Sequence, residues 1–309
     1  MFSMETPYLD SAAMASCSCL GRSLYYGIAK RGCQKTSVLP PRFPRYWRKR
    51  MTSADIRAGL RRGAPTVGAW LQLPSSDVAE IIGRMGYEWA AVDMEHGAFS
   101  RSGLPDIFRA LERRGTLPFV RLLEATKAEI KAALDSGAQG LIFPMIESRA
   151  QLDDAISHSL YPGGKEFAHG KRGVGFSRAN MYGLDFDSRQ DGGFGQEIVL
   201  VAQIEHVNAL RELDAIFSHP RLDAYMVGPY DLSASMGLTG NFAHPDFTAA
   251  LKDIENAAKK HGMARGIHVV TPNPAELQAK IAEGYSFLAY GTDALFLSGG
   301  ATRPAMSRS

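Results

Sequence analysis

From residue 51 onward, hydrophobic and polar positions follow two alternating patterns. Short apolar runs rich in Val, Ile and aromatic residues are each followed by a segment of roughly 10 to 15 residues with apolar positions at helical spacing. This alternation predicts parallel strands joined by helices. The expected strands are 66–73, 88–95, 117–124, 140–147, 198–205, 223–233, 264–270 and 286–293.

The intervening segments have the properties of amphipathic helices. Segments 126–137 and 274–284 both end at Gly, a common residue just past a helix C-terminus, and 76–86 has the same apolar spacing. Segment 53–63 predicts an extra helix before the first strand. Eight strand–helix rounds in about 250 residues predict an α/β fold of the (β/α)8 TIM-barrel type, with an open doubly wound sheet as the alternative.

Composition excludes several protein classes. The chain has 309 residues, of which 45% are hydrophobic and 22% charged, as in a globular protein with a full core. No window approaches the roughly 18 consecutive apolar residues that a membrane-spanning helix needs. We therefore expect no membrane partner, and one barrel domain over residues 51–309.

Residues 1–50 differ from the rest of the chain. They carry nine Lys and Arg against two acids, a balance of +7, so the remaining residues sum to −4 of the total +3. A mildly acidic body gives no reason to expect nucleic-acid binding. The segment holds all three cysteines and is poor in acids, which predicts a disordered extension or a mitochondrial transit peptide. The expected compartment is the cytoplasm, or the mitochondrial matrix if the segment is a transit peptide.

Polar side chains collect where the expected strands end. The stretch 199–206, VLVAQIEH, is an apolar run that ends in an amide, a carboxylate and an imidazole, and period-two alternation points Gln203 and Glu205 the same way. Because the carboxyl ends of barrel strands form one rim, these groups are candidates for an active site. The other strand-end candidates are Asp93, Glu95, His96, Arg121, Glu124, Glu147, Asp231 and His268.

The residue types at this rim favour metal-assisted chemistry. Glu205 and Asp231 are hard oxygen ligands that suit Mg²⁺ or Mn²⁺ with open positions for substrate. A 2-oxo acid can chelate such an ion, which then stabilises an enolate. Arg121 adds a fixed positive charge, and His96 is a candidate acid or base. The rim offers no lysine for a Schiff base, and the sequence contains no Gly-x-Ser-x-Gly elbow.

Taken together, these stretches resemble the HpcH/HpaI aldolase family of metal-dependent class II pyruvate aldolases, which includes 4-hydroxy-2-oxoheptanedioate aldolase. The resemblance runs in order through almost all of residues 55–296. Its motifs are VDMEHG (92–97), FVR (119–121), LDSGAQGLIFPMIE (134–147), the segment from YPGG to KRGVGFSRA (161–179), AQIEH (202–206) and VGPYDLSASMG (227–237).

The resemblance implies a role for individual positions. It implies metal ligation by Glu205 and Asp231, with Mg²⁺ or Mn²⁺ as the ion and Co²⁺ as an alternative. It implies that Arg121 stabilises the enolate, that His96 is the catalytic base and that Asp135 raises the strength of that base. The implied substrate-binding residues are Gln203, Asp231, Tyr230 through its backbone amide, and Trp70 as a pocket wall.

Two departures from the family pattern affect other expectations. The connection 161–196 is longer than in simple members, and loops of this kind set substrate choice. The resemblance implies that this chain forms a homo-oligomer, a trimer or hexamer, through a long apolar C-terminal helix. Here the end of the chain has a Gly-Gly pair at 299–300 and Pro304, which break a helix.

The predicted function is a lyase that cleaves a 4-hydroxy-2-oxo acid, of the 4-hydroxy-2-oxoheptanedioate or 2-keto-3-deoxy sugar acid type, into pyruvate and an aldehyde. The alternatives are an oxaloacetate decarboxylase or macrophomate synthase-like enzyme, an acyl-CoA lyase similar to the citrate lyase β-subunit, and a catalytically silent barrel acting as a scaffold. Without support from a motif, His206, His244 and His268 are interpreted as structural.

Overall fold

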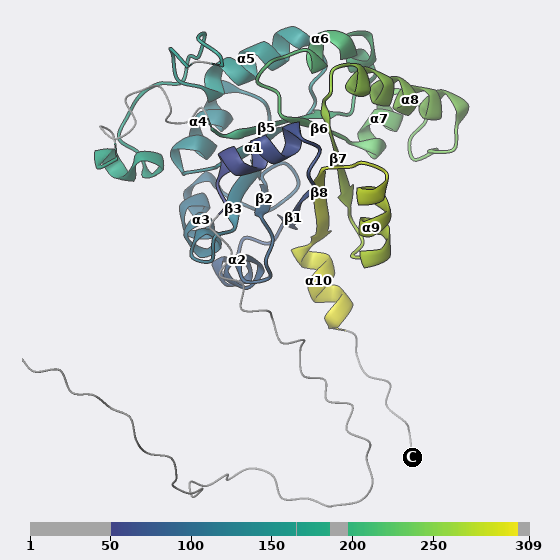
Figure 1. The fold of residues 1–309 in the computed structure, drawn as a ribbon. Helices are drawn as coiled ribbons and strands as arrows, with labels where there is room; N and C mark the ends of the chain where they lie inside the picture. The colour runs from purple at the N-terminus through teal and green to yellow at the C-terminus, as the bar shows by residue number, and fades with distance from the viewer. Residues whose placement is uncertain (1–50, 165, 186–196, 302–309) are drawn as a thin grey trace, which may run out of the picture. The chain divides into compact units, whose positions relative to one another are not determined.

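The computed structural model describes residues 51–164, 166–185 and 197–301, and they form a closed barrel of eight parallel strands in the order of the sequence (Figure 1). The predicted TIM-barrel fold class is confirmed. The prediction for residues 1–50 lies outside the described residues. The strands are β1 (Thr66–Leu71), β2 (Trp89–Asp93), β3 (Leu117–Arg121), β4 (Gly140–Phe143), β5 (Val199–Ile204), β6 (Ala224–Val227), β7 (Ala264–Val269) and β8 (Phe287–Thr292).

Helices follow the strands and cover the outside of the barrel. Several begin at a Ser or Thr whose side chain accepts a hydrogen bond from the first turn, as Ser75, Thr126 and Thr292 do. The α-helices are α1 (Ser53–Arg61), α2 (Ser76–Gly83), α3 (Leu104–Glu112), α4 (Lys127–Asp135), α5 (Arg149–Ser159), α6 (Leu213–Phe217), α7 (Pro229–Ser235), α8 (Pro245–Lys260), α9 (Pro274–Ala282) and α10 (Asp293–Gly300). Short 3₁₀ segments are η1 (Arg101–Gly103), η2 (Arg178–Gly183) and η4 (Val207–Arg211).

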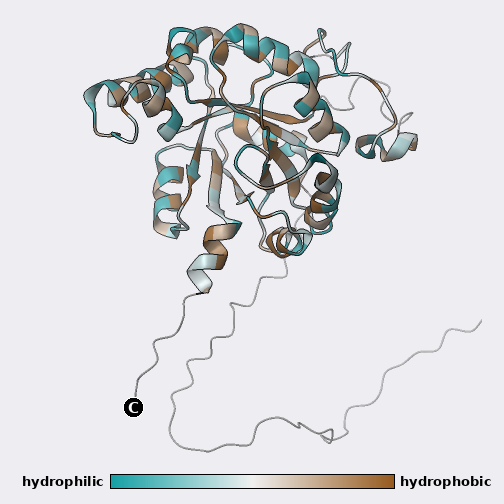
Figure 2. Cartoon of the chain, turned by 180° about the vertical axis from the view of Figure 1, so that it is seen from behind, coloured by the Kyte–Doolittle hydropathy of each residue, from teal (hydrophilic) through white to brown (hydrophobic). Residues whose placement is uncertain are grey.

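The barrel interior is packed with aromatic and aliphatic side chains. Trp89 stacks on Phe287 at 4.4 Å and on Phe119 at 5.2 Å between ring centroids. A Cβ at Gly68 would lie 2.1 Å from the Trp89 ring, so only glycine leaves room for the indole there. A second apolar cluster fills the layer between strands and helices, and the strands are correspondingly browner than the outer helices in Figure 2.

The extra helix α1 closes the amino end of the barrel, as predicted. Ile56 and Leu60 are buried in the interior cluster, and a capping box between Thr52 and Asp55 begins the helix. None of the helices in the described ranges combines the length and apolar character that crossing a membrane requires.

The strands end earlier than the sequence pattern predicts. The expected strand 223–233 stops at Val227, because Pro229 presets a helical φ and starts α7. The expected strand 140–147 likewise stops at Phe143. At the C-terminus α10 runs to Gly300, within the Gly-Gly pair expected to break it. The polar residues at the strand ends therefore lie partly on loops and helix starts, where side chains have more freedom to converge.

Candidate active site

Four inward-facing side chains form the last layer of the barrel interior, at its carboxyl side. Trp70 on β1 belongs to the interior cluster. Period-two alternation also points Arg121 on β3 into the interior, two residues after Phe119. In the same way it points Gln203 on β5 inward, two residues after Val201. His268 on β7 is the fourth, four residues after the interior Ala264. Side chains from alternate strands form such layers in TIM barrels, and the last layer faces the mouth where substrates bind.

Asp93 at the end of β2 organises this layer. Its carboxylate is fully buried and accepts hydrogen bonds from Trp70 Nε1 at 3.1 Å and from the backbone N–H groups of Glu95 and His96, both at 3.1 Å. The Arg121 guanidinium donates two more hydrogen bonds, from Nε at 2.9 Å and from Nη2 at 2.6 Å. Asp93 therefore fixes the indole, the loop that carries His96 and the arginine at once.

Arg121 is held as a permanent, oriented cation. In addition to its contacts with Asp93, Arg121 has its Nη1 2.9 Å from the Glu95 carboxylate and its Cζ 5.1 Å from the Trp70 ring centroid. Burial acts to raise the pKa of Asp93, but the hydrogen bonds and charge of Arg121 outweigh it and hold that pKa below its ordinary value. The Asp93–Arg121 pair thus stays ionised, and a bidentate contact of this kind limits the guanidinium to one orientation.

Glu205, which follows β5 at the same mouth, has the opposite pKa shift from Asp93. Its carboxylate is 1% exposed, accepts a hydrogen bond from the Met145 N–H at 2.7 Å and another from the Gln203 amide. Burial, together with the negative charges of Glu95 and Asp231, raises the pKa of Glu205 to about 7. This carboxylate has hydrogen-bond donors but too little positive charge around it.

Such an environment fits a divalent cation. Glu205 and Asp231 interact electrostatically, and both supply hard oxygen ligands. Asp231 is exposed in the first turn of α7 and therefore accessible to an ion from solvent. Within the described ranges, no three His, Cys, Asp or Glu side chains already form a metal-binding group. Two carboxylates with open positions match the chemistry of Mg²⁺ or Mn²⁺, which retain several waters, better than that of a closed zinc site.

His96 and Asp135, expected to act together, are not brought together within one chain. His96 is exposed on the loop that follows β2, at the carboxyl side of the barrel. Asp135 is the last residue of α4 and precedes β4, so it lies at the amino side. There the Asp135 carboxylate pairs with Lys131 Nζ at 2.6 Å and with Arg172 Nη2 at 3.4 Å.

Tyr230 and Asp231 lie in the first turn of α7, directly after β6. The Tyr230 side chain is 67% exposed and packs edge-on against Phe242 at 5.0 Å. Its backbone N–H follows Pro229 in the first turn of α7, where backbone N–H groups have no partner within the helix.

Two residues of this mouth were missed or undervalued by sequence reasoning. A Cβ at Gly228 would lie 2.1 Å from a Glu205 carboxylate oxygen and 3.0 Å from Gln203 Nε2, so this glycine makes room for both. Its position directly after a strand and before Pro229 was the available signal. His268, interpreted as structural, stacks on Trp70 at 4.8 Å, and burial lowers its pKa to about 4.

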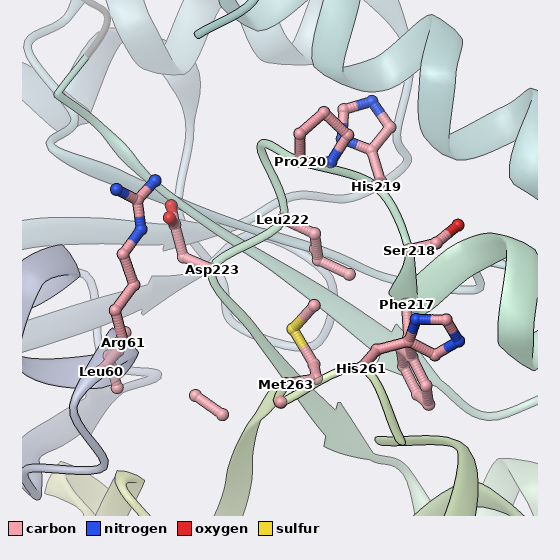
Figure 3. A pocket seen from close by; sticks show the side chains of 12 residues that line it. Leu60, Arg61, Phe217, Ser218, His219, Pro220, Leu222, Asp223, His261 and Met263 are labelled. Carbon is pink, nitrogen blue, oxygen red and sulfur yellow. The ribbon is translucent and has the colours of Figure 1, made fainter. Parts of the chain in front are cut away.

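A separate pocket of about 300 Å³ opens at the amino side of the barrel (Figure 3). Figure 3 shows Arg61 and Asp223 on one side of it and His219, Ser218 and His261 on the other. None of the predicted site residues lines this pocket. In TIM barrels the amino face contributes to stability, whereas the carboxyl face carries the chemistry.

Comparisons with known proteins identify the family of the chain. The sequence model of the family described as HpcH/HpaI aldolase/citrate lyase matches residues 66–298. A 2-keto-3-deoxy-L-rhamnonate aldolase of Salmonella gallinarum is 34% identical over 245 residues, which are 79% of this chain and 89% of that protein.

Among solved structures, an HpcH/HpaI aldolase/citrate lyase family protein from Burkholderia cenocepacia matches with a TM-score of 0.72 and 31% identity, over 80% of this chain and 95% of that one. An HpcH/HpaI aldolase from Desulfitobacterium hafniense matches with a TM-score of 0.67 and 26% identity, over 79% and 92% of the two chains.

Proposed function

The chain belongs to the HpcH/HpaI aldolase/citrate lyase family and is a carbon–carbon lyase, and on that premise we propose that it cleaves a 4-hydroxy-2-oxo acid into pyruvate and an aldehyde. The observation that carries this proposal is the Asp93–Arg121 pair beside Trp70, next to the buried Glu205–Gln203 pair. This arrangement places the fixed positive charge of Arg121 at the same mouth as the Glu205 carboxylate, which has no such partner and could hold a cation. An enolate oxygen needs positive charge on more than one side.

The pyruvate half of the substrate would bind at the buried layer. Glu205 and Asp231 would hold Mg²⁺ or Mn²⁺, with Co²⁺ as an alternative, and this ion supplies Lewis-acid stabilisation of the negative charge on the 2-oxo oxygen. Arg121 would donate hydrogen bonds to the same oxygen. Gln203 would contact the substrate from β5, and the Tyr230 backbone N–H would donate to the carboxylate of the pyruvate half.

Cleavage then needs one proton removed and one added. His96 would take the proton of the 4-hydroxyl, the C3–C4 bond would break with its electron pair moving into the enolate, and the aldehyde would leave. Protonation at C3 yields pyruvate. The His96 side chain is exposed on its loop, so it can exchange protons with solvent between turnovers. Asp135 has no part in this proposal, because within one chain it lies at the other end of the barrel.

A 2-keto-3-deoxy sugar acid is the substrate type we favour over 4-hydroxy-2-oxoheptanedioate. The support is the 34% identical relative named 2-keto-3-deoxy-L-rhamnonate aldolase, which aligns over most of both chains. Oxaloacetate decarboxylation passes through the same enolate without an aldehyde and is the expected side activity. In that reaction CO₂ leaves in place of the aldehyde, and no proton needs to be removed from a 4-hydroxyl.

The test is pyruvate release, coupled to lactate dehydrogenase, from 2-keto-3-deoxy sugar acids, 4-hydroxy-2-oxoheptanedioate and oxaloacetate, with and without Mg²⁺ or Mn²⁺. We expect metal-dependent release that falls about 100-fold or more in Arg121→Lys, because lysine cannot reproduce the bidentate contact. Arg221→Lys is the matched control: Arg221 is also buried and pairs with Asp223 at 3.2 Å, but at the amino side.

The outcomes separate the alternatives. Release from oxaloacetate alone would replace the aldolase by a decarboxylase. Turnover of acyl-CoA substrates only would favour an enzyme similar to the citrate lyase β-subunit. A folded protein without any turnover or metal binding would indicate a silent scaffold, and equal losses in Arg121→Lys and Arg221→Lys would remove the specific role of Arg121.

A further inference from the structure

His268 occupies the fourth position of the layer that faces the mouth, and its ring is held on two sides. One ring face stacks on Trp70, with centroids 4.8 Å apart and planes inclined by 29°. Its Nε2 lies 3.0 Å from the carbonyl oxygen of Gly291 on β8. Trp70 in turn donates to Asp93, so the imidazole belongs to the same rigid group of side chains as Arg121.

The hydrogen bond to Gly291 determines which ring nitrogen carries the proton. Burial makes the neutral imidazole the stable form near pH 7, and a carbonyl oxygen can only accept, so the single proton lies on Nε2. Nδ1 then presents a lone pair. No hydrogen-bond partner for Nδ1 lies in the part of the chain that the structure describes, and this nitrogen is not enclosed in the protein as an unsatisfied atom.

The position of β7 shows which part of a substrate would reach this lone pair. In a barrel of eight strands in sequence order, β7 lies opposite β3, which carries Arg121. In the proposed function Arg121 on β3, Gln203 on β5 and Tyr230 after β6 hold the pyruvate half of the substrate. With His96 after β2 at the 4-hydroxyl, the part of the mouth between β6 and β2, which includes β7 and β8, receives the rest of the substrate. There this part of the substrate meets Nδ1 of His268, a neutral hydrogen-bond acceptor. A hydroxyl group can donate to this nitrogen, whereas a carboxylate is disfavoured and an alkyl chain leaves the nitrogen without a partner.

We propose that His268 is a specificity-determining residue that accepts, at Nδ1, a hydrogen bond from a hydroxyl of the aldehyde-derived half of the substrate. The inference rests on the proposed function and narrows it to polyhydroxylated chains, such as those of deoxy sugar acids. His268 takes no part in bond cleavage. It selects which 4-hydroxy-2-oxo acid is positioned for cleavage by the other residues.

The experiment compares two substrates in His268→Phe, which keeps a flat ring against Trp70 but removes the acceptor. We measure kcat/KM for a 2-keto-3-deoxy sugar acid and for a 4-hydroxy-2-oxo acid of equal chain length with an alkyl tail. The ratio of the two should fall roughly tenfold, the effect of one neutral hydrogen bond. His268→Leu gives the same measurement if the phenylalanine variant does not fold. His261→Phe, at the amino side, is the control and should leave the ratio unchanged.

An unchanged ratio in either His268 variant, with both rates falling together, would overturn the inference and leave His268 as a packing residue only. In that case the proposed function would still stand, because the wild type would release pyruvate from both substrates. Release from neither substrate by the wild type would remove the proposed function and this inference with it.

Discussion

At the scale of single residues, two carboxylates at the same mouth have opposite properties. Asp93 is surrounded by donors and a guanidinium that keep it ionised, whereas Glu205 faces Glu95 and Asp231 and has a pKa of about 7. The folded state therefore binds more protons at Glu205 than the unfolded state between pH 4.5 and 7, so the contribution of Glu205 to the free energy of unfolding falls as pH rises through that window.

Glu205→Gln should stabilise the metal-free protein at pH 8, by about 1 to 3 kcal/mol, because it removes a buried charge without a counter-ion. The difference should shrink toward pH 5, where the wild-type carboxyl is protonated. Thermal unfolding measured across pH checks both statements. Mn²⁺ should raise the Tm of the wild type at pH 8 but not that of Glu205→Gln, while the rim variant Glu147→Gln should respond as the wild type does. A destabilised Glu205→Gln at pH 8 would contradict this account of the charge.

At the scale of elements, ion pairs as well as apolar packing hold α1 against the barrel. Arg57 of this helix lies 2.9 Å from the Asp223 carboxylate and 2.5 Å from that of Glu166, which also pairs with Arg61 at 3.2 Å. Glu166 comes from the long connection after α5, which was expected to set substrate choice. Its contacts place this part of the connection at the amino side, where it supports α1.

Glu166→Gln should lower the free energy of unfolding by about 1 kcal/mol, a modest value because the carboxylate is partly exposed and screened by water. Its pKa is lowered because Arg57 and the other arginines outweigh the effect of burial. The stabilisation is therefore present above the ordinary pKa of Glu and is lost as pH falls through the lowered value. Urea unfolding at a series of pH values from 7 downward tests this: a difference between the two proteins that does not shrink as pH falls would rule out the ionic origin. Glu283→Gln, which removes an exposed pair with Lys280, is the control.

At the scale of the whole molecule, the described residues form a closed sheet with two apolar clusters, one inside the barrel and one between strands and helices. Met51 packs on the interior cluster next to the start of α1. Residues 1–50 lie outside the described residues. The domain boundary expected near residue 51 thus stays a prediction with a direct test.

A chain that starts at Met51 should unfold within about 2 °C of the full-length protein and keep its kcat/KM, because the closed sheet and both apolar clusters described above are built from residues 51 onward. Differential scanning calorimetry and the pyruvate assay measure the two quantities. A chain that starts at Gly63 is the contrasting variant: it lacks Ile56 and Leu60 and should lose several degrees of Tm. A large loss already at Met51 would place the domain boundary earlier.

The order of apolar and polar positions was enough to predict the barrel and the rim. Parallel strands are buried on both faces, so each is written as a nearly continuous apolar run, and the runs recur with the helices between them. Because all carboxyl ends of such strands meet on one side, Arg121, Gln203 and Glu205 could be assigned to a common mouth before any coordinates were known. The boundaries were less predictable, as the run 223–233 shows, because Pro229 converts its second half into a helix.

Only the tertiary structure decided how these residues behave. Asp93 and Glu205 are chemically similar, and their different pKa values come from neighbours on other strands that no local pattern specifies. The same holds for His268, whose contacts come from β1 and β8, and for Asp135, which α4 carries to the opposite end. Periodicity depends on neighbours along the chain, so the sequence determined the fold; ionisation, orientation and selectivity depend on neighbours in space, and the closed barrel decides which those are.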